Sequence, residues 1–412
     1  MTKKSDAPAI RFKGFSDAWE QRKLTEFVEF FSGLTYTPND VQENGTLVLR
    51  SSNVSNGEVV DADNIYVNPQ VVNSENVKVG DIVVVVRNGS RSLIGKHAQI
   101  KAFMPNTVIG AFMTGIRSEC PEFTNALLNT SRFEEEIAMN MGATINQITG
   151  YMFSKMEFKV PCLDEQKKIG EYFEKLDNLI TLHQRKFEKL TNVKKSMLEK
   201  MFPQNGSSYP EIRFKGFTDP WEQRKLGELV DRVVRKNTNN ESTLPLTISA
   251  QYGLVDQITY FNNRVASRDV SNYYLVLNGE FAYNKSTSDG YPFGAVKRLD
   301  LYEKGVLSTL YIVFTPKKEQ QIDSDFLTVF FDTDRWHKGV AERAAEGARN
   351  HGLLNISAED FFDIDLSVPK DIVEQKQIGA FIRQLDNLIT LHQRELEKLQ
   401  NIKKSMLEKM FV

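Results

Sequence analysis

Apolar residues recur at alternating intervals of three and four in one stretch of the chain, and that stretch occurs twice. Residues 176–202 and residues 385–411 differ at only four positions. This spacing places the apolar side chains on one face of a long α-helix, in the heptad pattern of a coiled coil. The predicted seam, meaning this apolar face, consists of Ile169, Phe173, Leu176, Ile180, Phe187, Leu190, Met197 and Met201 in the first copy and of Ile378, Ile382, Leu385, Ile389, Leu396, Leu399, Met406 and Met410 in the second.

Each predicted helix has one apolar face to bury, and the other copy in the same chain is the partner at the highest effective concentration. We therefore predict that the two helices pair as a coiled coil. Because two equivalent halves close on each other about a pseudo-two-fold axis, the helices should be antiparallel. The alternative is two unrelated surface helices.

Two histidines, His183 and His392, fall beside the midpoints of the two seams. In an antiparallel pair the midpoints meet, so these side chains should approach each other and fix the register, since a polar layer opposes slippage. The alternative is that both side chains point to solvent. With a fixed register, the length of the helices would set the distance between the two halves.

A second repeat comes earlier in each half. Residues 10–24 recur as residues 212–226 with two substitutions, whereas the blocks that follow, residues 25–160 and 227–368, hardly match each other. Nearly identical repeated segments therefore flank two blocks of different sequence. We predict a first domain at residues 1–160, a central helical region at 161–202, a linker at 203–211, a second domain at 212–369 and a C-terminal helical region at 370–412.

The two unlike blocks have the patterns of α+β domains. Apolar runs at residues 82–86 and 307–314 predict buried strands, and residues 122–139 and 323–342 predict helices. Asn-Gly pairs mark tight turns between them. The predicted fold class is α+β, with two α/β domains separated by two long helices that form an antiparallel coiled coil in a pseudo-two-fold internal repeat.

Charge and cysteine content limit the class of protein. The chain has 52 Lys and Arg against 54 Asp and Glu, a net charge of −2, so nucleic-acid binding would have to depend on local patches. Two cysteines, no leader pattern and no apolar run long enough for a membrane span predict a cytoplasmic protein.

One such patch lies in the first block, because residues 82–118 contain no acidic residue but several basic ones. Arg, Lys, Asn and Ser side chains at a strand end are suited to phosphates and to base edges in the major groove. The predicted DNA contacts are Arg87, Asn88, Ser90, Arg91 and Lys96 in the first block and Gln251, Tyr252, Asn284, Lys285, Ser286 and Arg349 in the second. Ordinary solvated loops would explain the same residues.

Outside the seam, the two helices also share the stretches LHQR, N-x-KKS and LEKMF, although pairing along a seam does not require this. We predict two equivalent docking sites for partner proteins, formed by Arg185, Lys195 and Glu199 on the first helix and by Arg394, Lys404 and Glu408 on the second. The alternative is a recent duplication that has not yet diverged.

No catalytic or metal site is predicted. The sequence has no GxxxxGK[ST], GxGxxG, HExxH or CxxC pattern. It also lacks the Asn/Asp-Pro-Pro-aromatic and Phe-x-Gly-x-Gly motifs with which amino-methyltransferases bind the target amine and the methyl donor.

The whole arrangement resembles the specificity subunit of type I restriction-modification systems. Near-identical helical repeats around dissimilar inserts carry the resemblance, with WEQRKL at Trp19 and Trp221, GDIVVVVRNGS at residues 80–90, ISAQYGL at 248–254 and FAYNKS at 281–286. The resemblance implies a DNA-binding protein without catalytic activity. Each domain would read one half of a split, asymmetric site in double-stranded DNA, and the helices would hold the halves at a fixed spacing.

The same resemblance implies partners and cofactors. The helices would dock two modification (methyltransferase) subunits, and restriction (translocase and nuclease) subunits would complete the complex. S-adenosylmethionine, ATP and Mg²⁺ would belong to those partner subunits and none of them to this chain. Two other classes remain open: a coiled-coil scaffold with two protein-binding inserts, which would not bind duplex DNA with a steep salt dependence, and a self-sufficient methyltransferase.

Overall fold

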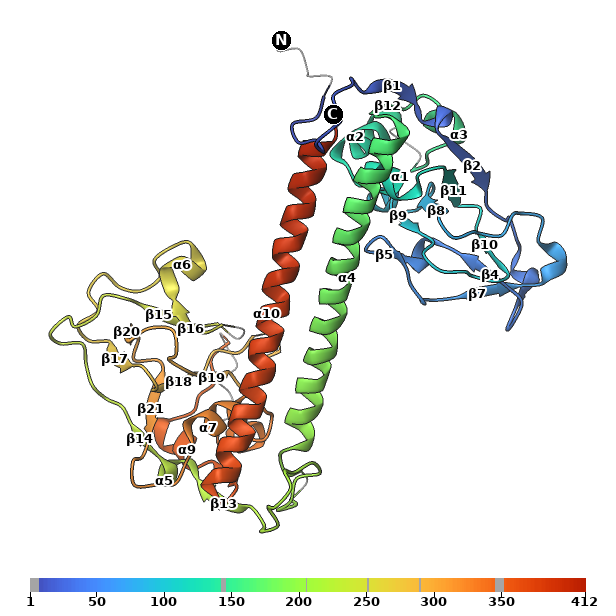
Figure 1. Ribbon diagram of the computed structural model, residues 1–412. Coiled ribbons are helices and arrows are strands. Elements are labelled where there is room, and N and C mark those ends of the chain that lie inside the picture. Colours follow the sequence, from blue (N-terminus) through green and yellow to red (C-terminus); the bar gives the residue numbers. More distant parts are fainter. Residues whose placement is uncertain (1–6, 142–145, 205, 250–251, 289, 345–351) are drawn as a thin grey trace. The chain divides into compact units, whose positions relative to one another are not determined.

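The structure is a computed structural model that describes residues 7–141, 146–204, 206–249, 252–288, 290–344 and 352–412. It divides into two compact units: unit 1 is Met1–Gln184 with Gln393–Val412, and unit 2 is Arg185–His392. Each unit contains one of the unlike blocks and a part of both long helices (Figure 1). The predicted five-part division along the sequence remains a prediction.

The two long helices are α4 (Leu163–Lys200) and α10 (Ile372–Met410), and their pairing is confirmed. In unit 1, Lys403 of α10 forms an ion pair with Asp177 of α4 at 2.6 Å. In unit 2, Lys194 of α4 forms the equivalent pair with Asp386 of α10, also at 2.6 Å. In each unit the early part of one helix contacts the late part of the other, so the pairing is antiparallel.

The predicted seam residues lie on the inner faces of the helices. Ile169, Phe173 and Leu176 are buried in the core of unit 1 together with Met410, and Ile378, Ile382 and Leu385 are buried in the core of unit 2 together with Met201. The remaining seam positions are half-buried or buried. His183 belongs to unit 1 and His392 to unit 2, and their approach stays a prediction.

The centre of unit 1 is a four-stranded antiparallel sheet. Its order is β2 (Val28–Ser32), β11 (Met113–Ser118), β8 (Ile82–Val85) and β9 (His97–Gln99). A second sheet has the order β10 (Thr107–Ile109), β4 (Thr46–Leu49), β7 (Ile65–Val67) and β3 (Val41–Gln42). Two two-stranded sheets pair β5 (Val54–Ser55) with β6 (Glu58–Val59) and β1 (Glu20–Lys23) with β12 (Glu157–Val160).

Unit 2 repeats the central sheet in the same order, although the sequences of the blocks hardly match. The order is β14 (Val230–Arg232), β21 (Ile312–Pro316), β18 (Phe281–Asn284) and β19 (Ala295–Arg298). Two-stranded sheets pair β13 (Glu222–Lys225) with β22 (Asp365–Val368), β15 (Leu246–Ser249) with β16 (Gly253–Asp256), and β17 (Tyr274–Leu277) with β20 (Lys304–Leu307). The unlike inserts therefore share their central topology.

The short helices correct two sequence predictions. The segment 122–139 is not one helix but two, α1 (Pro121–Leu128) and α2 (Ser131–Asn140), because the hydroxyl of Thr130 accepts from the backbone N–H of Phe133 and starts a new helix. The segment 323–342 likewise forms α7 (Ser324–Phe331) and α8 (His337–Arg343). The remaining short α-helices are α3 (Gly150–Phe153), α5 (Leu226–Leu229), α6 (Gln257–Phe261) and α9 (Ala358–Phe362).

The predicted strand at 307–314 is also wrong as a single element. Leu307 ends β20 and Ile312 begins β21, with a turn between them. In that turn the Ser308 carbonyl accepts from the backbone N–H of Tyr311, at 3.2 Å. The hydroxyl of the same serine accepts from the N–H of Leu310 at 3.4 Å. This local hydrogen bonding interrupts an apolar run that reads as continuous in the sequence.

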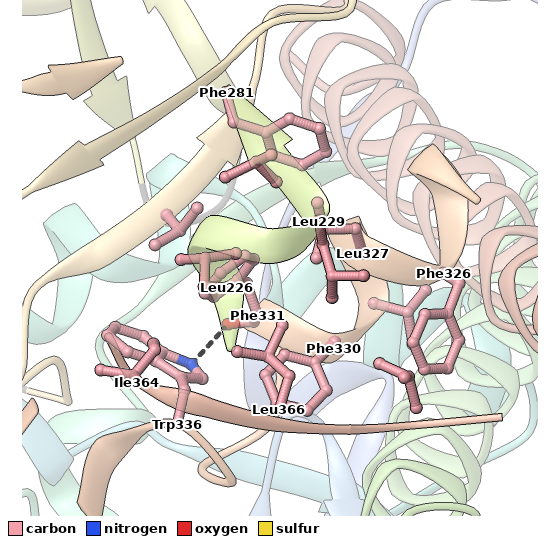
Figure 2. Packing of buried hydrophobic residues seen from close by; sticks show 14 of the residues in the cluster. Leu226, Leu229, Phe281, Phe326, Leu327, Phe330, Phe331, Trp336, Ile364 and Leu366 are labelled. Atoms are coloured by element: carbon pink, nitrogen blue, oxygen red, sulfur yellow. Dashed lines mark hydrogen bonds between the residues drawn. The ribbon is translucent and has the colours of Figure 1, made fainter. Parts of the chain in front are cut away.

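The core of unit 2 is rich in aromatic side chains (Figure 2). Phe326, Phe330 and Phe331 from α7 pack with Phe281 of the central sheet, and the indole N–H of Trp336 donates to the Phe331 carbonyl at 3.2 Å. The ends of the long helices belong to the same cores. Phe202, after α4, stacks on Phe326 in unit 2, and Phe411, after α10, stacks on Phe123 in unit 1.

The repeated residues of the sequence hold each insert on the helices, and we call them the docking frame. The guanidinium of Arg11 forms two 2.7 Å hydrogen bonds with the buried carboxylate of Glu165 at the start of α4. Arg213 does the same with Glu374 of α10, at 2.7 and 2.8 Å. Bidentate pairs of this kind fix orientation as well as distance. The frame consists of Arg11, Glu165, Gln166 and Gly170 in unit 1 and of Arg213, Glu374, Gln375 and Gly379 in unit 2.

The glycine of each frame allows a backbone-to-backbone contact. A Cβ atom on Gly170 would lie 2.8 Å from the backbone nitrogen of Phe123 in α1. A Cβ atom on Gly379 would lie 2.8 Å from the backbone nitrogen of Phe326 in α7. A backbone atom cannot turn aside as a flexible side chain can, so the N-terminal turn of each short helix requires glycine on the long helix.

This contact predicts whether alanine in place of Gly170 raises or lowers the free energy of unfolding. Alanine normally stabilises a helix interior by about 0.5–1 kcal/mol relative to glycine, but Gly170→Ala should lower the free energy of unfolding by about 1–3 kcal/mol, because it forces the two backbones apart. Urea denaturation measures the change. Gly150→Ala is the control, because its Cβ would have no atom within 4 Å. A Gly170→Ala protein as stable as the wild type would contradict the close contact.

Unit 2 contains a half-buried charge cluster at the end of α7. Asp332 is the C-cap residue of α7 and follows its last residue, Phe331. Its carboxylate lies 2.7 Å from the Lys297 ammonium and 3.3 Å from the Lys194 ammonium. Burial alone would raise the pKa of Asp332, but the attraction of the two lysines outweighs it and the pKa is lowered. In unit 1 the residue that ends α1 is the neutral Asn129.

The cluster should make unit 2 sensitive to acid. A lowered folded-state pKa contributes stability that is present above the unfolded-state pKa and is lost as the pH falls through the folded-state pKa. At pH 7, Asp332→Asn should cost roughly 3 kcal/mol, because it removes the carboxylate that pairs with the half-buried Lys297, whereas Lys194 keeps its pair with Asp386. The difference from wild type should narrow as the pH falls below 3.8, the ordinary pKa of an aspartate, because the unfolded-state carboxylate then binds a proton while the folded-state carboxylate is still charged. Urea titrations at several pH values test this.

The control for the charge cluster is Asp334→Asn. Asp334 is well exposed and pairs with Arg335 at 3.5 Å, so its removal should cost no more than about 1 kcal/mol. An Asp332→Asn cost that stays constant from pH 7 to pH values well below 3.8 would show that the cluster does not act through the charge of this carboxylate.

Candidate nucleic-acid interface and docking surfaces

All five residues predicted to contact DNA in the first block lie in one hairpin loop of unit 1. The loop connects β8 to β9 and is closed by a hydrogen bond from the Val85 N–H to the Lys96 carbonyl, at 2.8 Å. Arg87, Ser90 and Arg91 are exposed, whereas Asn88 and Lys96 are half-buried. The structure therefore brings together the whole predicted set.

Side-chain contacts of Asn88 and Arg87 support this loop. The side chain of Asn88 accepts from the N–H of Ser90 at 3.0 Å and donates to the hydroxyl of Ser51 at 3.1 Å. The guanidinium carbon of Arg87 lies 5.0 Å from the centre of the Phe112 ring. Asn88 therefore supports the loop, and the arginine side chain is positioned by an aromatic residue. Ser51 and Phe112 had no motif that identified them in the sequence.

The acid-free stretch of the sequence separates into paired and unpaired cations. Arg117 pairs with Asp81 at 2.8 Å and with Glu75 at 3.0 Å, and Lys101 lies 3.8 Å from Glu58. Hydrogen bonds to Asp81 raise the pKa of Arg117. His97 is buried, and burial lowers its pKa so that the ring is kept neutral. These three groups add no free positive charge.

The cations that remain are those of the hairpin loop. Within the described part of the chain, Arg87, Arg91 and Lys96 have no carboxylate within ion-pair distance. A cluster of unpaired positive charge raises the local concentration of a polyanion. The loop is therefore suited to a phosphate-bearing partner.

In unit 2, the predicted residues come from two turns. Asn284 ends β18, and its side chain accepts from the N–H of Ser286 at 3.0 Å; the Lys285 ammonium lies 3.4 Å from the Ile356 carbonyl. Ser286 is exposed, and so is Tyr252 in the turn between β15 and β16. Gln251 and Arg349 lie outside the described residues.

The loops after β8 and β18 occupy the same place in their units. The Val86 carbonyl accepts from the N–H of Ile148 at 2.8 Å, and the Lys285 carbonyl accepts from the N–H of Leu354 at 2.9 Å. The next residues, Arg87 and Ser286, each form an isolated antiparallel bridge to the neighbouring segment. One fold therefore presents an arginine in one unit and a serine in the other.

The predicted docking residues all lie on the exposed faces of the long helices. Arg185, Lys195 and Glu199 on α4 are exposed, as are Arg394, Lys404 and Glu408 on α10. A shallow groove on each helix is lined by equivalent residues: Arg185, Glu188, Lys189, Asn192, Val193, Ser196 and Met197 on α4, and Arg394, Glu397, Lys398, Asn401, Ile402, Ser405 and Met406 on α10. We call these two surfaces the helix grooves.

The other predicted residues flank these grooves. Lys195 follows Asn192, and Glu199 follows Ser196, by three residues, which places them on neighbouring positions of the same helix face. The same holds for Lys404 and Glu408 on α10. Each groove therefore offers charges of both signs around two half-buried apolar side chains.

Within the described ranges, no group of three or more His, Cys, Asp or Glu side chains is placed to hold a metal ion. Among the helices that the structure describes, none is long and apolar enough to cross a membrane.

Comparison with known proteins shows the family. The family model described as "Type I restriction modification DNA specificity domain" matches residues 16–192 and 218–401. The specificity subunit of the type I restriction enzyme StySPI from Salmonella potsdam is 27% identical over 174 residues, which are 40% of this chain and 36% of that protein. The specificity subunit of the type I restriction enzyme MjaVIII from Methanocaldococcus jannaschii is 24% identical over 279 residues, 65% of this chain and 64% of that protein. The match thus spans less than two thirds of each relative.

The fold is similar to that of a solved structure over almost its full length. The crystal structure of a type I restriction-modification system S subunit from M. genitalium covers 98% of this chain, and 99% of that subunit is matched, with a TM-score of 0.65 and 14% identity. Because the family model matches well over half of the residues, in two separate copies, the chain belongs to the family of type I restriction modification DNA specificity domains.

Proposed function

We propose that this chain is the DNA-recognition subunit of a type I restriction-modification complex, without catalytic activity of its own. The observation that carries the proposal is the pairing of one fold with two unlike loops. Units 1 and 2 share a central sheet and a docking frame, but the equivalent positions carry Arg87 in one and Ser286 in the other. Unlike loops on equal supports are suited to the two halves of an asymmetric site.

Each unit reads one half-site of double-stranded DNA through its strand-end loops. In unit 1, Arg87 and Arg91 contact base edges or phosphates, and Lys96 contacts a phosphate, because an ammonium acts on phosphates as a point charge. Ser90 adds a hydroxyl, and Asn88 acts mainly by holding the loop. In unit 2, the contacts come from Tyr252, Asn284, Lys285 and Ser286, together with Gln251 and Arg349.

The helix grooves bind the partners of the complex. Two grooves with equivalent linings suit two copies of one partner, and charges of both signs beside a small apolar centre suit a protein surface. We assign these partners as two modification (methyltransferase) subunits, with restriction subunits in the full complex. S-adenosylmethionine, ATP and Mg²⁺ act in the partner subunits.

The DNA assignment predicts the effect of removing two unpaired charges. In the complex with its modification subunits, Arg87→Ala with Arg91→Ala should weaken DNA binding by at least tenfold, since one arginine contact to guanine is worth about 1–3 kcal/mol. If both arginines contact phosphates, the slope of log K against log salt should fall by about 2. Titration of a duplex at several salt concentrations measures both quantities. The site is first found by mapping methylated adenines in cells that carry the system.

The matched control is Arg132→Ala, because Arg132 is half-exposed in the same unit but is paired with Glu136 and Glu135 on its own helix. It should leave affinity and salt slope unchanged. Wild-type binding that does not depend on salt would favour a protein-binding scaffold over the DNA function.

The docking assignment predicts a graded loss of stoichiometry. Reversing one charge, Lys195→Glu, should remove one modification subunit and leave a one-to-one complex, whereas Lys195→Glu with Lys404→Glu should remove both. Mass measurement of the assembled complex by light scattering checks this. Lys318→Glu, outside the helices, is the control for a change in net charge. A two-to-one complex that survives the double reversal would place the docking sites on another face.

A further inference from the structure

In each unit a large apolar side chain is exposed beside the loop that carries the proposed DNA contacts. Phe112 precedes β11 in unit 1 and is 56% exposed, and Leu310 precedes β21 in unit 2 and is 61% exposed. Single exposed apolar side chains are ordinary on protein surfaces. The position of these two residues is what distinguishes them.

Strand register shows that Phe112 and Leu310 are equivalent. Val86 in unit 1 and Lys285 in unit 2 are at equivalent positions after β8 and β18. The residues two positions earlier, Val84 and Tyr283, are therefore also equivalent. Val84 pairs with Thr114, and Tyr283 pairs with Ile312. The residues two positions before these partners are Phe112 and Leu310. Two inserts of unlike sequence thus keep an exposed large apolar residue at one point of the shared fold.

The backbone of Phe112 is fixed to the loop after β8. Its carbonyl accepts from the N–H groups of Val86, at 3.0 Å, and of Arg87, at 3.2 Å. Because the Arg87 guanidinium also lies over the ring, ring and cation form one continuous surface. In unit 2 the N–H of Leu310 is held by the Ser308 hydroxyl at 3.4 Å. Neither residue stands on an unsupported loop.

The surroundings indicate what this surface binds. Arg87, Arg91 and Lys96 are cations without carboxylate partners in the described part of the chain, which favours a polyanion over an apolar protein surface. In the major groove, the apolar group on the base edges is the 5-methyl group of thymine, and phenylalanine is among the side chains that contact it.

We propose that Phe112 and Leu310 are specificity-determining residues, each of which contacts a thymine methyl group in the major groove beside the bases read by the loop after β8 or β18. The inference rests on the proposed DNA-reading function. A flat ring and a branched aliphatic group at one position of the fold differ in shape, so they also contribute to the difference between the two half-sites.

Uracil lacks only the methyl group of thymine, which gives a direct test. The wild-type complex with its modification subunits is titrated with the mapped site, in which each thymine in turn is replaced by uracil. One replacement in the half-site of unit 1 should weaken binding roughly fourfold, the factor for one buried methyl group. Phe112→Ala should weaken binding to the thymine site by at least that factor, and the same uracil should then have no further effect. Leu310→Ala should act in the same way on the other half-site only.

Matched controls exist at the opposite ends of the same sheets. Phe103 follows the end of β9 where Gln99 pairs with Ile82, and Leu301 follows the end of β19 where Arg298 pairs with Phe281. Both side chains are at least as exposed as Phe112. Phe103→Ala and Leu301→Ala should bind like the wild type. Phe112→Ala should also leave the salt slope unchanged, because it removes no charge.

The outcomes separate this inference from the function on which it rests. If Phe112→Ala and Leu310→Ala bind like the wild type while the loss of Arg87 and Arg91 weakens binding, the thymine contact is wrong and the DNA function stands. A site in which no uracil weakens wild-type binding also overturns the thymine assignment. A wild-type complex that does not bind the duplex overturns both proposals.

Discussion

The close approach of a short helix to a glycine on a long helix is the constraint on which the placement of both inserts depends. With no room for a Cβ atom on Gly170 or Gly379, the first turns of α1 and α7 pack directly against the backbone of α4 and α10. Backbone contacts tolerate little displacement, because packed interiors transmit strain. The Arg11–Glu165 and Arg213–Glu374 pairs then fix the orientation. The position of each domain on its helix is thus set by residues that lie outside the variable loops.

This arrangement separates support from recognition within each unit. In unit 1, one end of β9 lies near the docking frame, because Gln99 donates to Glu122 of α1, which packs on Gly170. The other end of the strand follows Lys96 of the hairpin loop. The residues of the hairpin loop are not among the residues of the docking frame, so the loop sequence can change while the frame residues stay the same. Equivalent positions therefore carry different residues at the loop end, Arg87 against Ser286 and Phe112 against Leu310, while the frame residues are the same in both units.

The long-range features of the fold could be predicted from the sequence, because they leave a periodic trace. The heptad spacing gave the two helices, and the near identity of the repeats gave their pairing. The shared central sheet could not be predicted, because β8 and β18 agree in backbone register while Arg87 and Ser286 differ in chemistry. The break at Thr130 was missed for a different reason: one hydroxyl accepting one backbone N–H ends a helix without changing the apolar pattern.

The candidate site shows the same limit. A count of acidic residues within residues 82–118 cannot include Asp81, Glu75 and Glu58, which pair with Arg117 and Lys101 from outside that stretch. Asn88 has the side chain of a base-reading residue, but its amide is used to hold the loop. Conversely, no pattern in the sequence singles out Phe112, and its exposure appears only in three dimensions.

Charge pairing also explains how a chain of net charge −2 can present a surface suited to DNA. The buried carboxylates of Glu165 and Glu374 and the half-buried carboxylate of Asp332 are each paired with a cation of their own unit, so their negative charge is largely offset. Charges farther away than about 8 Å are largely screened at physiological ionic strength. The local excess of positive charge at Arg87, Arg91 and Lys96 therefore decides which kind of partner the loop attracts. The helix grooves carry both signs of charge in close alternation, so they present no such excess.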